Sequence, residues 1–317
     1  MKRRLGVISA AMAGLLLAPA VGVAQETVKM GVSIPAATHG WTGGLNWHAQ
    51  QAEKELEERY PTLDVVLVSA SDAARQANDL EDLVSIHNID ALVILPFESA
   101  PLTDPVRQVK DQGKFVTVVD RGLTDPGIQD LYVAGNNPEM GQVSARYIEE
   151  KLGGEGKIVV LRGIPTVIDN QRVDAFMKEI EDSNIEVLGM EYANWNRDDG
   201  FRVMQDFLAR FPEIDAVWAQ DDDIALGVIE AVQQAGREDE MFILGGAGMK
   251  DIIRRVMDDD KLVPADVLYP PAMIAEAMEI TARHLVEGEP IEKEYILEAT
   301  LVTPENAEQY YYPDSPF

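Results

Sequence analysis

Short apolar runs alternate with segments of helical periodicity along the chain, and the alternation occurs in two successive series. The first series predicts strands at residues 28–34, 63–69, 91–95 and 115–119 and helices at 46–59, 73–87 and 102–112. The second predicts strands at 158–161, 185–190, 216–219, 242–244 and 262–268 and helices at 170–182, 200–211, 224–234, 251–257 and 273–288. Strands without regular polar alternation are typical of parallel sheets covered on both faces. The sequence therefore predicts an α/β fold of two doubly wound parallel-sheet lobes.

The ends of these strands carry the candidate functional residues, because ligands of doubly wound sheets bind beyond the carboxyl ends of the strands. Residues at or near those ends are 39–42, 96–98, Asp120, Arg121, Arg172, Trp195, Asp221, Asp222 and 245–249. They combine planar polar groups with aromatic rings. Polar groups of this kind bind adjacent hydroxyls, and ring faces pack against C–H surfaces. The pattern indicates a small polyhydroxylated ligand.

Two charged segments follow apolar strands. Asp120 and Arg121 follow the predicted strand at 115–119, and they can span vicinal hydroxyls as acceptor and donor or form a simple loop ion pair. Asp221 is expected to point into the cleft, while Asp222 or Asp223 caps the helix that follows. Regular calcium-ligand spacing is missing from this acidic segment. The sequence therefore predicts ligand contacts here and no metal.

Two tryptophans lie in polar or glycine-rich segments, where they stack on a ligand or pack the lobes together. Trp41 is flanked by Gly40 and Gly43, and Trp195 by two asparagines. The segment 245–248 reads GGAG between a strand and a helix, so it can cradle a phosphate or form a tight loop that lines the cleft. The four histidines lack zinc-ligand spacing, and no nucleophile elbow or matched acid–base set appears. These patterns favour binding over catalysis, without metal or cofactor.

The N-terminus and the charge constrain where the protein works. Residues 1–24 combine a positive start, an apolar stretch and small residues before position 25, which is typical of a cleaved secretory signal peptide. The chain has 55 acidic and 27 basic residues, a net charge of −28, and no cysteine. Such a surface repels nucleic acids. The acidic excess is either ordinary for an exported protein or an adaptation to high salt.

Several segments together resemble the periplasmic ribose-binding-protein family over roughly residues 28–300. They are VTVVDR at 116–121, QRVDAF at 171–176, VMQ at 203–205, VWAQDDDIALG at 217–227 and LGG at 244–246. The resemblance implies a type I periplasmic binding protein, a monomer whose two lobes are joined by a three-strand hinge and close over the ligand. It implies a first lobe of residues 26–134 plus 269–297 and a second of 135–268 plus 298–317.

The resemblance also implies the ligand contacts. Family contact positions fall on His39, Trp41, Thr42, Asp120, Arg121, Arg172, Trp195 and Asp221. The chain departs from ribose binders at Ala247, where the family has an aspartate, and at Leu268, where it has a glutamine. Losing two polar partners disfavours ribose itself, and a different pentose, a tetritol or another polyol fits as well. His39 and Glu98 are expected to supply replacement polar contacts.

The expected function is capture of a sugar or sugar alcohol in the periplasm for the permease of an ABC importer. The alternatives are a sensor component for a chemoreceptor or histidine kinase and a binder of a non-sugar small molecule. A transcriptional regulator would need a DNA-binding helix pair and a basic face, and a secreted sugar enzyme would need a catalytic constellation. The sequence favours neither of these two.

Overall fold

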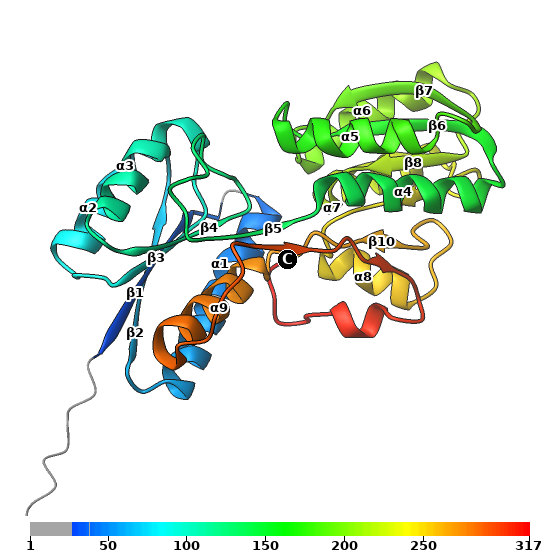
Figure 1. The fold of residues 1–317 in the computed structure, drawn as a ribbon. Coiled ribbons are helices and arrows are strands. Elements are labelled where there is room, and N and C mark those ends of the chain that lie inside the picture. Colours follow the sequence, from blue (N-terminus) through cyan, green and yellow to red (C-terminus); the bar gives the residue numbers. More distant parts are fainter. Residues whose placement is uncertain (1–26, 38) are drawn as a thin grey trace, which may run out of the picture.

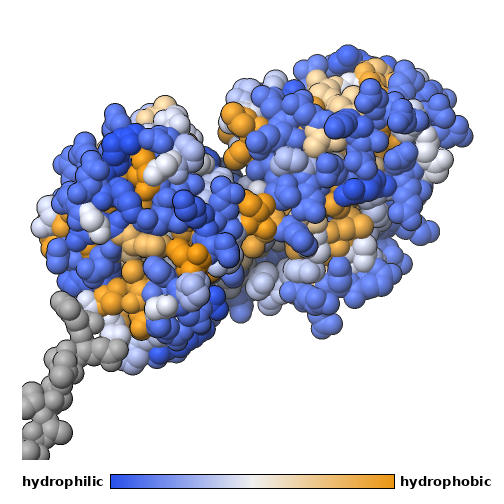
Figure 2. All heavy atoms as spheres, viewed as in Figure 1, coloured by the Kyte–Doolittle hydropathy of each residue, from blue (hydrophilic) through white to orange (hydrophobic). Residues whose placement is uncertain are grey.

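The computed structural model describes residues 27–37 and 39–317, and Figure 1 shows two lobes side by side, connected through a narrow middle region. The predicted signal peptide lies outside the described residues. Within the described residues, no helix is long and apolar enough to cross a membrane. Figure 2 shows mostly hydrophilic side chains on the visible face and a hollow between the two lobes.

The first lobe is built on a six-stranded parallel sheet of order β11-β5-β4-β3-β1-β2. Its strands are β1 (Val28–Pro35), β2 (Leu63–Ala70), β3 (Ala91–Ile94), β4 (Phe115–Val119), β5 (Leu131–Gly135) and β11 (Glu294–Leu297). Its helices are α1 (Gly40–Arg59), α2 (Ala73–Ser85), α3 (Ser99–Asp111) and α9 (Met273–Glu287). Helices α2 and α3 lie on one face of the sheet, and α1 and α9 on the other (Figure 1).

Strand β3 shows why this sheet has no polar alternation. Leu92 and Ile94 belong to the apolar cluster under α2 and α3, whereas Val93 belongs to the cluster under α1 and α9. All three side chains are fully buried. Each face of the strand therefore needs apolar residues, as both sides of the sheet are covered.

The second lobe repeats the plan with a four-stranded parallel sheet of order β7-β6-β8-β9. The strands are β6 (Glu155–Arg162), β7 (Asn184–Tyr192), β8 (Ala216–Ala219) and β9 (Phe242–Leu244). The helices are α4 (Asn137–Leu152), α5 (Val167–Glu179), α6 (Arg197–Arg210), α7 (Asp222–Ala235) and α8 (Lys250–Met257). Helix α4 packs on α5, and α6 packs on α7. Read from one edge, each sheet has its second strand along the chain first, followed by its first, third and fourth strands. This is the order of a doubly wound sheet, so the predicted fold class is confirmed.

The chain crosses between the two sheets three times: after β5, between β10 (Asp266–Val267) and α9, and between β11 and β12 (Leu301–Val302). Strands β10 and β12 pair antiparallel beside the middle region. A 3-10 helix, Ala307–Tyr310, follows and packs near α8. The predicted strand at 262–268 is wrong in extent, because only Ala265, Asp266 and Val267 of this run pair with other strands. Pro264 lies in this run and has no N–H for a strand ladder.

Candidate ligand-binding site

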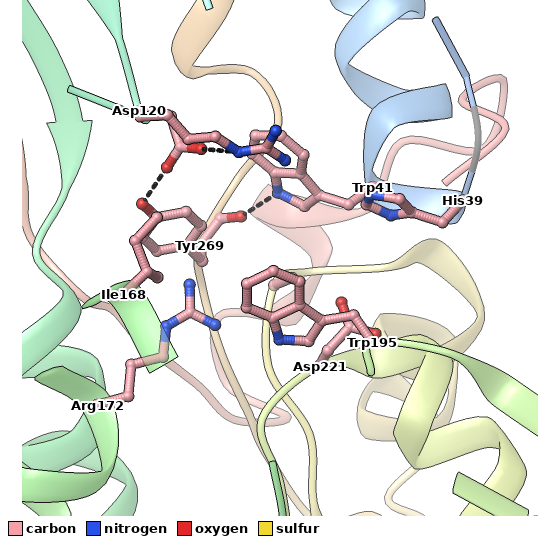
Figure 3. A pocket seen from close by; sticks show the side chains of 10 residues that line it. His39, Trp41, Asp120, Ile168, Arg172, Trp195, Asp221 and Tyr269 are labelled. Carbon is pink, nitrogen blue, oxygen red and sulfur yellow. Dashed lines mark hydrogen bonds and ion pairs between the residues drawn. The ribbon is translucent and has the colours of Figure 1, made fainter. Parts of the chain in front are cut away.

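One cavity opens between the carboxyl ends of the two sheets, with a volume of about 50 Å³ (Figure 3). Its lining comprises His39, Trp41, Asp120, Arg121, Ile168, Arg172, Trp195, Asp221, Ala247 and Tyr269. The first four come from the first lobe, the next five from the second lobe, and Tyr269 from the second crossing. The structure thus brings seven of the nine residues predicted from sequence around one space.

Asp120 and Arg121 follow β4, where the backbone turns sharply. Asp120 has a left-handed φ of 57° and its N–H donates to the carbonyl of Val133 at 2.9 Å. Its Oδ1 accepts from the Tyr269 hydroxyl at 2.5 Å, while Oδ2 lies 4.0 Å from Arg121 Nε. Arg121 NH1 donates to the Phe97 carbonyl at 2.7 Å. This arrangement orients a carboxylate oxygen and a guanidinium side by side at the cavity.

Arg172 is the cation of the opposite lobe and is only 5% exposed. Its Nε donates to Asn137 Oδ1 at 2.9 Å and its NH1 to the Gln220 carbonyl at 3.2 Å. The guanidinium carbon lies 4.4 Å from the centre of the Tyr269 ring. Guanidinium has five N–H donors, so these two bonds leave donors for a hydroxyl in the cavity.

The two tryptophans are placed differently from each other. Trp41 lies in the first turn of α1, and its Nε1 donates to the Tyr269 carbonyl at 2.9 Å. Trp195 precedes α6 with a left-handed φ of 51°, and its ring lies 6.0 Å from the Arg172 guanidinium carbon. A Cβ at Gly163 would collide with this indole, so the glycine makes room for it. Each ring borders the cavity (Figure 3).

Asp221 lines the cavity, as expected, but it is also the N-cap of α7. Its Oδ1 accepts from the backbone N–H groups of Asp223 at 2.9 Å and Ile224 at 3.3 Å. The prediction that Asp222 or Asp223 caps this helix is therefore wrong. Burial, with repulsion from Asp223 second, raises the pKa of Asp221 to about 7. This carboxyl can accept or donate a hydrogen bond near neutral pH.

His39 precedes α1 at the cavity edge. Burial, and next the positive charge of Arg121, lower its pKa, so the ring is neutral at physiological pH. One residue on, the Gly40 N–H donates to Asp223 Oδ2 at 3.1 Å. This bond joins the first turn of α1 in one lobe to α7 of the other.

Thr42 and Glu98 do not line the cavity in the described part of the chain. The Thr42 hydroxyl accepts from the His39 N–H at 3.2 Å and donates to the His39 carbonyl at 2.9 Å, which fixes the start of α1. Glu98 is exposed and directly precedes α3. Thr42 supports the site from behind, and Glu98 lies outside the cavity lining, so its contact with a ligand stays a prediction.

Tyr269 was not predicted as a site residue. It is 5% exposed, and Asn137 Nδ2 donates to its hydroxyl at 3.3 Å. A Cβ at Gly135 would collide with its ring, so this glycine at the end of β5 makes room for the tyrosine. The sequence signal was its position in the Tyr-Pro-Pro segment of a hinge crossing, beside the atypical Leu268.

The glycine loop at 245–248 binds a carboxylate of its own chain. Asp222 accepts from the N–H groups of Gly246 at 2.8 Å, Gly248 at 3.0 Å and Met249 at 2.7 Å. These amides are the donors that a phosphate would need. The phosphate interpretation is therefore wrong, and Ala247 of this loop lines the cavity instead. Among the described residues, no group of three or more acidic or histidine side chains is placed to hold a metal.

Comparison with known proteins places the chain among binding proteins. The model of the periplasmic binding protein domain family matches residues 30–290. The ribose import binding protein of Bacillus subtilis is 29% identical over 242 residues, which is 76% of this chain and 77% of the relative. The xylitol-binding protein of Mycolicibacterium smegmatis is 28% identical over 256 residues, 78% of this chain and 70% of the relative.

Solved structures agree with this placement. An ABC transporter solute binding protein from Bacillus halodurans with bound myo-inositol has a TM-score of 0.78 and 25% identity, and the match covers 90% of this chain and 97% of that one. The fructose-binding periplasmic domain of a hybrid two-component system has a TM-score of 0.74 and 28% identity, with 89% and 92% coverage. The predicted resemblance is confirmed: this chain is a binding protein that belongs to the periplasmic binding protein family.

Proposed function

We propose that the protein is exported to the periplasm, captures a sugar or sugar alcohol between its lobes, and delivers it to the permease of an ABC importer. The observation that carries this proposal is the cavity itself, in which Asp120 and Arg121 of one lobe face Arg172 of the other beside two tryptophan rings. A ribose import binding protein and a xylitol-binding protein among the relatives support it.

Each polar side chain has a distinct role in this proposal. Asp120 Oδ2 accepts a hydrogen bond from one ligand hydroxyl, and Arg121 donates to its neighbour. Arg172 donates from the opposite lobe, and the Trp195 ring packs against ligand C–H groups. Because the donors come from both lobes, the ligand stabilises the closed arrangement over an open one.

The lobe boundaries of the proposal follow the crossings. The first lobe comprises residues 26–134 plus 269–297, and the second 135–268 plus 298–317. The protein acts as a monomer after removal of residues 1–24. The three crossings between them serve as the hinge.

A thermal-shift screen of the mature protein tests ligand capture, because a ligand that binds only the folded state raises the melting temperature. The panel contains pentoses, hexoses, tetritols, pentitols and inositols. The shift in melting temperature should disappear in Arg172→Ala and persist in Arg146→Ala. Arg146 is a matched control, because it lies on neighbouring α4, is half exposed and pairs with Glu179. No shift across the panel would favour a non-sugar ligand, and a hit unaffected by Arg172→Ala would reject the proposed site.

A sensor role is the second candidate, because one structural relative is the sugar-binding domain of a two-component system. Uptake of the radiolabelled ligand by cells with and without the gene separates the two. Loss of uptake supports delivery to an importer. Unchanged uptake with loss of ligand-induced transcription supports sensing.

A further inference from the structure

Tyr269 lies on the second crossing and lines the cavity, and its ring and backbone are held by three neighbours. Gly135 leaves no Cβ against one face, and the Arg172 guanidinium carbon lies 4.4 Å from the ring centre. The Tyr269 carbonyl accepts from Trp41 Nε1 at 2.9 Å. The ring is therefore held by both lobes and by the first crossing, and it is a wall of the cavity that does not swing freely.

The Tyr269 hydroxyl is hydrogen-bonded to two polar groups that a ligand hydroxyl could otherwise bind. It donates to Asp120 Oδ1 at 2.5 Å and accepts from Asn137 Nδ2 at 3.3 Å. Asp120 thus has one oxygen bound to the protein and only Oδ2 turned toward Arg121. The tyrosine hydroxyl stands where a ligand hydroxyl would satisfy the same two partners.

Two positions close to the hinge crossing, Ala247 and Leu268, offer no polar side chain to the cavity. Ala247 contributes a methyl group to the lining, and its N–H is bonded to the Val267 carbonyl at 2.9 Å. Leu268 is 7% exposed and packs under Gly248 instead of facing the cavity. A ligand carbon that reaches Tyr269 would meet an aromatic ring, and the nearer Asp120 oxygen is already bonded to the tyrosine hydroxyl.

We propose that Tyr269 sets the length of the ligand and selects polyhydroxylated molecules of four or five carbons over those of six. This inference rests on the proposed function and specifies its substrate class. The cavity volume of about 50 Å³ agrees with a small ligand, since pockets for drug-sized ligands span roughly 300–1,000 Å³. The sixth carbon is excluded because Tyr269 already fills its space and binds its partners.

Isothermal titration of the mature wild-type protein with a chain-length series tests the inference without any variant. The series is erythritol, xylitol and sorbitol, together with erythrose, ribose, xylose, allose and galactose. The best four- or five-carbon ligand should bind at least ~10-fold more tightly than any six-carbon one, the discrimination expected of a closed pocket for one extra carbon. Equal or tighter binding of a six-carbon ligand overturns the inference while leaving the proposed function intact.

Three variants then assign the selectivity to the ring. Tyr269→Ser opens the end of the cavity and should reduce the preference for short ligands by ~10-fold or more. Tyr269→Phe keeps the ring and should keep the length preference. Tyr132→Phe is the control, because its hydroxyl donates to the Asp120 carbonyl at 2.6 Å but lies outside the cavity lining.

The outcomes distinguish failure of the role given to Tyr269 from failure of the proposed function. An unchanged length preference in a folded Tyr269→Ser protein overturns the role of Tyr269 but not the function. Absence of wild-type binding to every member of the series overturns this inference, and the wider thermal-shift panel then decides whether the proposed function stands.

Discussion

Asp221 combines helix capping with a place at the ligand cavity, and this position makes its charge costly. The side chain is 6% exposed, and Asp223 adds a second negative charge nearby. An aspartate whose pKa is raised from 3.8 to about 7 on folding binds a proton in the folded state that the unfolded chain releases. Stability from this residue is therefore fully present below pH 3.8 and is lost as pH rises to about 7.

Asp221→Asn should remove this dependence while keeping an oxygen for the helix cap. The melting temperature of the variant should exceed that of the wild type by a margin that widens from pH 4 to pH 7 and then stays constant. The full margin corresponds to a few kcal/mol, at about 1.4 kcal/mol per pKa unit. Melting curves at half-unit pH intervals check this, and a margin independent of pH would contradict the raised pKa.

Trp195 is the aromatic side chain that the second lobe contributes to the cavity. Trp195→Ala should weaken binding of the ligand by roughly 10-fold or more, because ring contacts of this kind are worth about 0.5–1.5 kcal/mol beyond the buried area. Trp47→Ala is the control, since Trp47 is half-buried on α1 and packs edge-on to His48, away from the cavity lining. Titration calorimetry gives both affinities, and equal losses in the two variants would remove Trp195 from the site.

At the scale of elements, the loop between β9 and α8 is built around a buried carboxylate pair. Asp222 and Asp266 are both fully buried, and the Gly248 N–H donates to each of them at 3.0 Å. Burial raises the pKa of both carboxyls, that of Asp266 to about 6, and their mutual repulsion adds to the shift at Asp222. One proton shared by the pair relieves the repulsion between the two carboxylates.

The two asparagine substitutions in this pair should have opposite effects. Asp222→Asn loses one of the oxygens that accept from three loop amides, and an unpaired buried amide costs about 1–3 kcal/mol. Asp266→Asn removes the repulsion and should raise the melting temperature by a margin that grows from about pH 4 to pH 6. Thermal melts of both variants at pH 5 and pH 8 check this. Stabilisation by Asp222→Asn would refute the structural role of its amide contacts.

Sequence patterns predicted most elements because strands with both faces buried are apolar throughout. Helix α1 begins earlier than its sequence pattern indicates. Its first five residues include three glycines that disfavour a helix, so the sequence predicted a start at residue 46 instead of Gly40. The Thr42–His39 hydrogen bonds and the bond from Gly40 to Asp223 in the other lobe stabilise this turn, and no local pattern reveals the second of these.

The site was predictable where its residues follow strands, as Asp120, Arg121 and Asp221 do. Tyr269 was missed because it lies on a crossing between lobes, outside either strand–helix series. Its contacts with Gly135 and Asp120 join segments far apart in the sequence. Strand β5 and helix α4 were also missed, although α4 has Asn136 as its N-cap and a proline in its first turn.

With a net charge of −28, the acidic side chains repel one another across the whole protein. The face seen in Figure 2 is mostly hydrophilic. Raising NaCl from 0.1 M to 1 M shortens the Debye length from about 10 Å to about 3 Å. The melting temperature should therefore rise with salt. A variant carrying Glu55→Gln, Glu58→Gln, Glu238→Gln and Asp239→Asn, all exposed, should respond less. A melting temperature that does not increase with salt would exclude adaptation to high salt.

The position of the indoles has an optical consequence. Trp41 and Trp195 border the ligand cavity from opposite lobes, whereas Trp218 is fully buried against Phe176. Under the proposed function, the surroundings of two of the four tryptophans of the chain therefore change when a ligand fills the cavity. The intrinsic emission spectrum of the unlabelled protein is then expected to report occupancy, with one emitter on each side of the cleft.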